Sequence, residues 1–235
     1  MSYDFSVNEL HKVETIRIGR EQNPIIIVDD VLAKPNALVD FAAAEAAFRQ
    51  PGNYYPGLRG EPLPKPYVAA LLRAFNPLIG ETFGAPVDGS LQANFYFGLA
   101  TVPPTELTML QRLPHFDTTN LNQIAVLHYL CDTLHGGTIF VRHRETGFES
   151  IDEARKARYF ELLKHDIDAN GPPPAQYVSS KDRLFEQTAC FEAKFNRMLI
   201  YRSRMLHSGN VNPASNLSSD PRRGRLTANL FLAYG

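Results

Sequence analysis

Three side chains in this sequence have the types and the spacing of a metal site. His115 and Asp117 are separated by one residue, and His207 follows far downstream, after an apolar stretch. In an extended strand, residues i and i+2 point to the same side, so His115 and Asp117 would share one face. Two imidazoles and a carboxylate on one face of ferrous iron leave coordination positions open, as in non-haem iron oxygenases. The three residues therefore predict an oxygen-activating iron centre, provided that the fold brings them together. A hydrogen-bonded surface pair is the alternative interpretation of His115 and Asp117 taken alone.

Arg225 and Thr227 form a second notable pair, downstream of His207. They alternate along an expected strand and so would share one face. An arginine that faces into an apolar barrel requires an anion, because a buried unpaired charge is very unfavourable. The guanidinium group fits a carboxylate, and a dicarboxylate co-substrate such as 2-oxoglutarate would supply one. The alternative is that Arg225 is an ordinary arginine at the edge of a strand.

Composition and charge argue against several classes of protein, namely nucleic-acid-binding, membrane and disulfide-bonded proteins. The 235 residues include 24 Lys and Arg against 25 Asp and Glu, with no basic run, so we expect no nucleic-acid partner. We see neither a membrane-spanning stretch nor a signal peptide, and therefore expect a cytoplasmic protein without a membrane partner. The two cysteines, Cys131 and Cys190, lie in apolar, strand-like stretches and are expected to be buried and reduced.

The hydrophobic pattern predicts a single domain, residues 1–235, that is mainly β with flanking helices. Residues 1–89 should form a supporting strand and helices, and residues 90–235 the catalytic core. The opening is expected to contain a strand at 24–30, helices at 35–49 and 66–82, and a loop at 50–66. The core is expected to contain strands at 91–99, 123–131, 137–141, 188–194, 197–202 and 226–233. Short strands separated by turn signals are typical of a sandwich or a barrel.

One segment, residues 145–187, interrupts the strands of the expected core. Ser150 has the character of an N-cap for a helix over 151–165, which the Asn-Gly-Pro-Pro-Pro sequence would end. We expect this insertion to lie over one end of the barrel. Together with the aromatic segment Asn53-Tyr54-Tyr55-Pro56, it would line the entrance to the site.

The order of these motifs resembles the prolyl-hydroxylase-like branch of the iron(II)- and 2-oxoglutarate-dependent dioxygenases. The similar stretches are Gln-Arg-Leu-Pro-His-Phe-Asp (111–117), His-Tyr-Leu (128–130), Gly-Gly-Thr-Ile-Phe (136–140), Phe-Glu-Ala-Lys-Phe-Asn-Arg-Met-Leu-Ile-Tyr (191–201), His-Ser-Gly (207–209) and Arg-Leu-Thr-Ala-Asn-Leu-Phe-Leu (225–232). The resemblance implies a double-stranded β-helix, or jelly roll, with Fe(II) held by His115, Asp117 and His207.

The same resemblance implies a binding site for 2-oxoglutarate. Arg225 would bind its distal carboxylate with help from Thr227, and Tyr129 stands where the family often places a tyrosine hydroxyl for that group. Tyr129 could equally be an aromatic core residue. Many relatives carry Lys where Arg225 stands, and the interval from His207 to Arg225 is longer than is common.

The implied activity is hydroxylation of a small-molecule or peptide substrate by O2, coupled to the decarboxylation of 2-oxoglutarate to succinate. The identity of the substrate, the type of oxidation and the oligomeric state stay open. Two other functions also stay open. One is a jelly-roll protein that binds a sugar or another small molecule without turnover, and the other is a cupin-like metalloenzyme that does not use 2-oxoglutarate.

Overall fold

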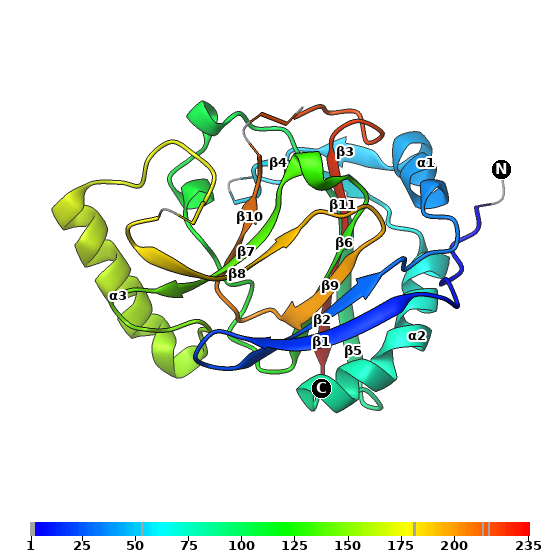
Figure 1. Cartoon of the computed structure of the whole chain (residues 1–235), viewed down its shortest axis with the longest axis horizontal. Coiled ribbons are helices and arrows are strands. Elements are labelled where there is room, and N and C mark those ends of the chain that lie inside the picture. Colours follow the sequence, from blue (N-terminus) through cyan, green and yellow to red (C-terminus); the bar gives the residue numbers. More distant parts are fainter. Residues whose placement is uncertain (1–2, 53, 181, 213, 216) are drawn as a thin grey trace.

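The computed structural model describes residues 3–52, 54–180, 182–212, 214–215 and 217–235. Within these residues the chain forms two antiparallel sheets, one of eight strands and one of three, with three α-helices outside them (Figure 1). In Figure 1, α3 lies on one side of the molecule and α1 and α2 lie on the opposite side.

The large sheet has the strand order β1-β2-β9-β6-β11-β5-β4-β3, and the small sheet has the order β10-β7-β8. The strands of the large sheet are β1 (Lys12–Ile18), β2 (Asn23–Asp29), β3 (Ala47–Arg49), β4 (Gly57–Glu61), β5 (Leu91–Ala100), β6 (Gln123–Tyr129), β9 (Met198–Arg202) and β11 (Arg225–Tyr234). Those of the small sheet are β7 (Gly137–His143), β8 (Phe185–Glu192) and β10 (His207–Asn210). The helices are α1 (Asn36–Glu45), α2 (Lys65–Phe83) and α3 (Glu153–Asn170), with short 3-10 turns at Pro104–Glu106, Leu110–Arg112 and Thr133–His135.

From β5 onward the chain passes back and forth between the two sheets. Strands β5, β6, β9 and β11 lie side by side in the large sheet, whereas β7, β8 and β10 form the small one. The segment at His115 lies beside β10 through an antiparallel bridge, and so adds a short fourth element to the small sheet. This alternation is that of a double-stranded β-helix, and it confirms the predicted fold class.

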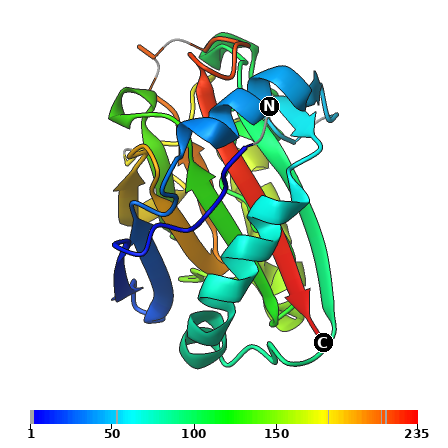
Figure 2. The same cartoon turned by 90° about the vertical axis from the view of Figure 1, so that its right-hand side faces the viewer.

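Alternate residues of β11 separate the interior of the barrel from a second core. Ala228 and Leu230 pack with Phe75 of α2 in a cluster that also includes α1 residues, on the outer face of the large sheet. Figure 2 shows both helices lying across that face. Because side chains alternate along a strand, Arg225 and Thr227 point to the other face, which is the interior of the barrel.

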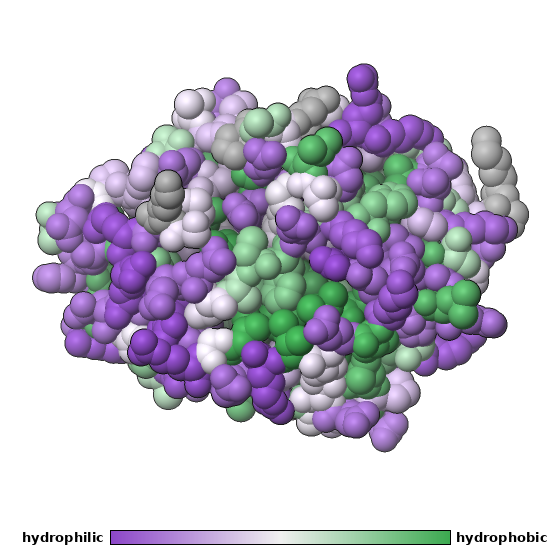
Figure 3. Space-filling model, in the orientation of Figure 1, coloured by the Kyte–Doolittle hydropathy of each residue, from purple (hydrophilic) through white to green (hydrophobic). Residues whose placement is uncertain are grey.

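The barrel interior contains a largely apolar cluster of side chains. Ile25, Phe140, Leu199 and Tyr201 belong to its buried cluster, and Ile27 is a partly exposed residue packed against it. On the face seen in Figure 3, hydrophobic side chains gather over β2 and β9, with hydrophilic side chains around them. The two sheets therefore pack a largely hydrophobic cluster between them, and a few polar groups project into the same interior.

Helix α3 packs on the outer face of the small sheet, where Tyr159 and Leu163 contact the cluster that contains Ile139 and Val141 of β7. The expectation that this insertion lies over one end of the barrel was therefore wrong. The helix begins at Glu153 rather than at residue 151, because the carboxylate of Asp152, not Ser150, caps it by accepting a hydrogen bond from the Arg155 amide at 2.9 Å. The helix ends at Asn170, the first residue of the expected stop, and so extends beyond the predicted end at residue 165.

Four strands were not predicted from the sequence: β1, β3, β4 and β10. Strand β1 is mostly exposed and rich in charged residues, so it lacks the apolar pattern of a buried strand. Strands β3 and β4 lie where a helix end and a loop were expected. Gly57 of β4 lies against β5 so closely that a Cβ there would come within 2.1 Å of the Leu99 carbonyl oxygen. The glycines that resemble loop residues therefore permit close strand pairing.

The two cysteines differ in their environments. Cys131 is buried, as expected, but Cys190 is exposed, because it is on the face of β8 that points away from the barrel interior. No helix in the described part of the chain is both long enough and apolar enough to cross a membrane.

Candidate functional site

A short antiparallel bridge between His115 and His207 brings together the two histidines that are remote in sequence. The amide of each residue donates a hydrogen bond to the carbonyl of the other, both at 2.9 Å. Residues that exchange both hydrogen bonds stand directly opposite each other, so their side chains project to the same side. The Asp117 amide donates to the Ser203 carbonyl at 2.8 Å and holds the third residue beside them.

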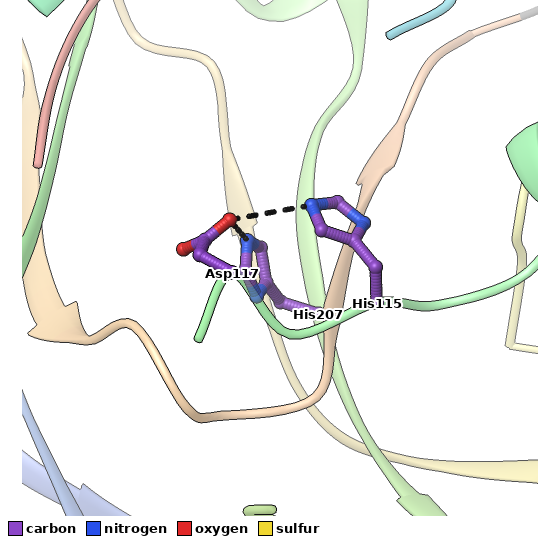
Figure 4. Close-up of side chains that lie close together, drawn as sticks. All are labelled: His115, Asp117 and His207. Atoms are coloured by element: carbon purple, nitrogen blue, oxygen red, sulfur yellow. Dashed lines mark ion pairs between the residues drawn. The ribbon is translucent and has the colours of Figure 1, made fainter. Parts of the chain in front are cut away.

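The three side chains turn toward a common point (Figure 4). Asp117 Oδ1 lies 3.7 Å from His115 Nε2 and 3.9 Å from His207 Nε2. One ligand atom from each of the three residues lies within 4.8 Å of the other two. The spacing is too long for hydrogen bonds, so the three groups converge without binding one another directly.

A backbone contact fixes the orientation of the His207 ring. His207 Nδ1 lies 2.8 Å from the Met205 carbonyl oxygen, which can only accept a hydrogen bond. Nδ1 therefore carries the proton, and the lone pair of a neutral His207 is on Nε2, the atom that faces Asp117. The ring also packs at a centroid distance of 5.0 Å from Tyr201, which restricts its rotation.

Burial controls the charges in this group. Burial lowers the pKa of His207 to about 4, so its imidazole is neutral at pH 7. Burial raises the pKa of Asp117 to about 6, although its charge is still favoured at pH 7. Asp117 Oδ2 is buried and has no hydrogen-bond partner among the described residues, although the Ser203 hydroxyl is near enough to oppose the rise in the Asp117 pKa. His115 is the most accessible of the three, with a side chain that is 57% exposed.

Arg225 lies inside the barrel at the start of β11. It is buried, and its Nη2 donates a hydrogen bond to the Gly137 carbonyl oxygen at 2.7 Å. Its Nε is buried without a partner among the described residues. Its guanidinium carbon lies 5.9 Å from the centroid of the Tyr129 ring. The arginine was thus correctly expected to face inward, and within the described chain it forms no ion pair with a carboxylate.

Thr227 and Tyr129 stand opposite each other on β11 and β6, on the same inner face as Arg225. The Tyr129 hydroxyl donates a hydrogen bond to Thr138 Oγ1 at 2.6 Å, so in this structure it is committed to the protein. Thr227 Oγ1 accepts a hydrogen bond from Asn229 Nδ2 at 3.0 Å. The structure therefore brings all three predicted pocket residues to one face, and both hydroxyls also have partners within the chain.

Three inward-facing polar residues were not identified from the sequence: Arg59, Tyr96 and Tyr201. Arg59 comes from β4, which has the composition of a loop, so its direction could not be assigned before the strand was known. Tyr96 and Tyr201 could have been found, because they alternate with the apolar residues of β5 and β9 that face the helices.

The aromatic segment that was expected at the entrance has two described tyrosines with different positions. Asn53 lies outside the described residues. Tyr54 is 76% exposed. The Tyr55 hydroxyl is instead buried in the barrel beside Thr227, without a hydrogen bond of good geometry to a described residue. Only Tyr55 therefore reaches the inner face.

Solved structures with a related arrangement include two enzymes, both distant in sequence. One is the non-heme alpha ketoglutarate dependent carbocyclase SnoK from nogalamycin biosynthesis, with 12% identity, a TM-score of 0.48, and coverage of 91% of this chain and 81% of that one. The other is an N-substituted L-amino acid dioxygenase from Burkholderia ambifaria AMMD, with 9% identity, a TM-score of 0.40, and coverage of 95% and 94%.

No curated protein matches the sequence. A family model described as a family of unknown function, DUF6445, matches residues 9–232, which is nearly the whole chain. The protein therefore belongs to the DUF6445 family.

Proposed function

We propose that this protein is an Fe(II)- and 2-oxoglutarate-dependent oxygenase that hydroxylates a small-molecule or peptide substrate. The observation that carries the proposal is the convergence of His115, Asp117 and His207 at one point of a double-stranded β-helix. Two imidazoles and one carboxylate are the ligands of the facial triad of non-haem iron enzymes, which leaves positions open for other ligands.

The residues present fit a divalent cation. The His207 lone pair is directed by the hydrogen bond at its other nitrogen, as is usual for a ligating histidine. The Asp117 carboxylate is partly buried, and its buried Oδ2 has no partner among the described residues, so the charge is poorly compensated and unfavourable. A bound cation would remove this penalty, because it would neutralise Asp117 and use both histidine lone pairs.

Arg225 supports 2-oxoglutarate as the co-substrate. Its buried guanidinium has an Nε with no partner among the described residues, and such a group favours a carboxylate inside the barrel. Thr227 lies two residues farther along the same face of the strand. Tyr129 could join by turning its hydroxyl from Thr138 toward the same carboxylate, since its ring already lies beside Arg225.

When bound, iron and 2-oxoglutarate supply the activation of O2 and the oxidising equivalents for the substrate. The chain itself supplies binding, orientation and a dry cavity. His115, Asp117 and His207 hold the ion, Arg225 sets the direction of the co-substrate, and the Phe140 and Tyr201 rings exclude water beside His207. Because the iron carries the chemistry, no separate acid or base is assigned.

The test is anaerobic titration of the protein with Fe(II) and then with 2-oxoglutarate, followed by visible absorption. We expect a weak charge-transfer band that depends on both additions. Arg225→Ala should abolish the band at moderate 2-oxoglutarate concentration. Arg222→Ala is the matched control and should leave it unchanged, because Arg222 is half exposed and pairs with Asp40 at the surface.

The same experiment separates the other functions. If Fe(II) does not bind to the wild-type protein, the oxygenase proposal is wrong and a jelly-roll binding protein is favoured. If Fe(II) binds but 2-oxoglutarate gives no band, a cupin-like metalloenzyme is favoured instead. Release of succinate from 2-oxoglutarate in air, even without a substrate, would support the oxygenase over the cupin-like enzyme.

A further inference from the structure

Arg59 places a second positive charge on the inner face of the large sheet. In the register of the sheet, Arg59 of β4 stands opposite Gly98 of β5, Gly98 stands opposite Thr227, and Thr227 stands opposite Tyr129. Residues that stand directly opposite each other in a sheet project to the same side. Arg59 therefore belongs to the same transverse row as two residues of the proposed co-substrate pocket.

The described part of the chain provides no anion for this charge. Arg59 Nε is buried without a hydrogen-bond partner, and its guanidinium carbon lies 4.2 Å from the centroid of the Tyr96 ring. Two other arginines that are buried or partly buried do contact carboxylates. Arg142 lies 3.6 Å from Glu149, and Arg197 lies 2.6 Å from Asp29. Stacking on an aromatic ring holds the guanidinium plane in place and leaves its edge free to donate hydrogen bonds.

A neighbouring arginine makes the excess of positive charge larger. Arg49 of β3 stands directly opposite Arg59 at the edge of the same sheet. Like charges in opposite positions of a sheet repel each other and are destabilising. An anion bound between the strand edge and the barrel interior would relieve that repulsion.

The space beside Arg59 is bordered by further hydrogen-bond donors. Gly98 has no side chain, and a Cβ at this position would come within 2.6 Å of the Tyr55 hydroxyl oxygen and 2.9 Å of Asn229 Nδ2. The Tyr55 hydroxyl is buried and has no partner of good geometry among the described residues. Glycine at position 98 thus lets the Tyr55 hydroxyl lie close over β5, at the position that stands opposite Arg59, so a hydroxyl donor and a guanidinium donor occur near each other on the inner face.

Aromatic rings also lie beside the Arg59 guanidinium. Tyr96, on which Arg59 stacks, lies on the neighbouring strand and packs against Phe231 at a ring distance of 5.8 Å. A molecule held by Arg59 would therefore have a charged end at the guanidinium and an apolar surface toward the aromatic rings.

We propose that Arg59, with the Tyr55 hydroxyl, binds a carboxylate of the substrate, so that the substrate of this protein is an organic acid. The inference rests on the proposed function. In the proposed function Arg225 binds one carboxylate of 2-oxoglutarate, and the metal would take the other, so an anion at Arg59 would come from another molecule. Arg59 is on β4, outside the eight elements of the jelly roll, whereas the proposed metal ligands and 2-oxoglutarate residues lie within them. Its position therefore suits it to selecting the substrate rather than to binding the metal or the co-substrate.

The test is calorimetric titration of small acids and their uncharged amides into the full-length protein. The pairs are acetate and acetamide, hexanoate and hexanamide, and benzoate and benzamide. Each is titrated into the protein loaded with Ni(II) and N-oxalylglycine, a non-reacting mimic of 2-oxoglutarate, and also into the metal-free protein. We expect at least one acid to bind at least tenfold more tightly than its amide.

Arg59→Gln should remove this preference and weaken binding of that acid at least tenfold. Arg59→Lys should retain part of it, because it keeps the charge but loses the planar donor geometry. The control is Arg73→Gln, at an exposed position of α2, which should change nothing. Thermal unfolding of each variant checks folding, and Arg59→Gln should not lower the melting temperature, because it removes an unpaired charge.

Two results would overturn the inference. One is that no acid binds more tightly than its amide in the wild-type protein. The other is that Arg59→Gln weakens N-oxalylglycine as strongly as Arg225→Gln does, which would assign Arg59 to the co-substrate. If Ni(II) and N-oxalylglycine bind but no acid preference exists, only this inference fails. If an acid preference that depends on Arg59 exists without metal binding, the anion site stands and the oxygenase function fails.

Discussion

Two clusters of buried polar groups lie on opposite faces of β6, and they differ in how completely they are satisfied. On the outer face, Tyr67 donates a hydrogen bond to His128 Nδ1 at 2.9 Å, and His128 Nε2 donates to Asn196 Oδ1 at 3.1 Å. Asn196 also accepts from the Leu32 amide and donates to the Leu32 carbonyl, both at 3.0 Å. Burial lowers the pKa of His128 to about 4, so this cluster is neutral.

The inner face has the opposite character. Asp117 Oδ2, the Tyr55 hydroxyl, Arg59 Nε and Arg225 Nε are all buried and have no hydrogen-bond partner among the described residues. Three of these four residues can carry a charge, and the fourth is a hydroxyl. A buried polar group without a partner is unfavourable, and native structures contain few of them.

The comparison indicates which polar groups serve stability and which serve binding. The outer cluster joins α2, the loop at Leu32 and the turn before β9, and each of its groups has a partner within the chain. The inner groups converge in the barrel and are left for ligands to satisfy. Both sets are buried polar groups, so burial alone does not identify the site. The convergence of several unpartnered groups in one place does, because unpartnered atoms also occur elsewhere in the described chain, as in Arg142 and Arg204.

The largest expected effect is on the inner face, from Asp117→Asn. Removing a group that only orients a metal ligand by a hydrogen bond already lowers metal affinity by about 10–100-fold. Removing the charge of a ligand itself should therefore lower the affinity for Fe(II) by more than about 100-fold. The metal-free variant should be at least as stable as the wild type, because a buried, poorly partnered charge is removed. Anaerobic calorimetry and thermal unfolding measure the two effects. A large loss of stability without metal would place Asp117 in a structural cluster and break the comparison.

Asn196→Ala should have its effect on stability instead. The substitution leaves the Leu32 amide and His128 Nε2 without their shared acceptor, and it places Ala at a φ of 65°. Unsatisfied buried groups and the left-handed backbone together should lower the free energy of unfolding by about 3 kcal/mol. Urea unfolding measures this, with Asn94→Ala on exposed β5 as the control. Fe(II) affinity of the folded variant should be unchanged, and a tenfold loss would show that the clusters are coupled.

The pH dependence of metal binding should follow Asp117. Its pKa is raised to about 6 by burial, so protons compete with the metal below about pH 6 and Fe(II) affinity should fall about tenfold per pH unit. The pKa of His207 is lowered to about 4, so its imidazole does not compete until lower pH. Since the folded pKa of Asp117 lies above its unfolded value, its charge lowers the stability of the metal-free protein above pH 6, and this effect disappears as the pH falls. Titrations between pH 5 and pH 8 check the slope, and Asp117→Asn should lose it.

The smallest expected effect comes from Tyr129→Phe, which removes the hydrogen bond to Thr138 on the inner face. The net loss of stability should be about 1 kcal/mol, the usual value for one buried hydrogen bond. If Tyr129 also binds 2-oxoglutarate, the variant should weaken that ligand as well. A loss of stability with unchanged 2-oxoglutarate affinity would assign Tyr129 to the structural group and sharpen the boundary between the two clusters.

The local hydrophobic pattern of the sequence was sufficient to predict many of the strands and helices that form the core. The apolar stretches of β2, β6, β9 and β11 and the long face of α2 were predicted because strong hydrophobic periodicity survives in a single sequence. The edge strands β1 and β3, and β4 beside β3, were not, because an exposed or glycine-containing strand is defined by the partner it pairs with. Cys190 was misplaced for the same reason, since the face of an irregular strand depends on its register.

The amino-acid sequence by itself determined the residue types of the site, the face shared by Arg225 and Thr227, and the order of elements that makes a jelly roll. Only the tertiary structure decided that His115 and His207 stand opposite each other, which polar groups have partners, and that Arg59 joins the inner row. The physical reason is that periodicity and composition act over a few neighbouring residues. Strand register, ring orientation and hydrogen-bond partnering arise between segments that are far apart in the chain.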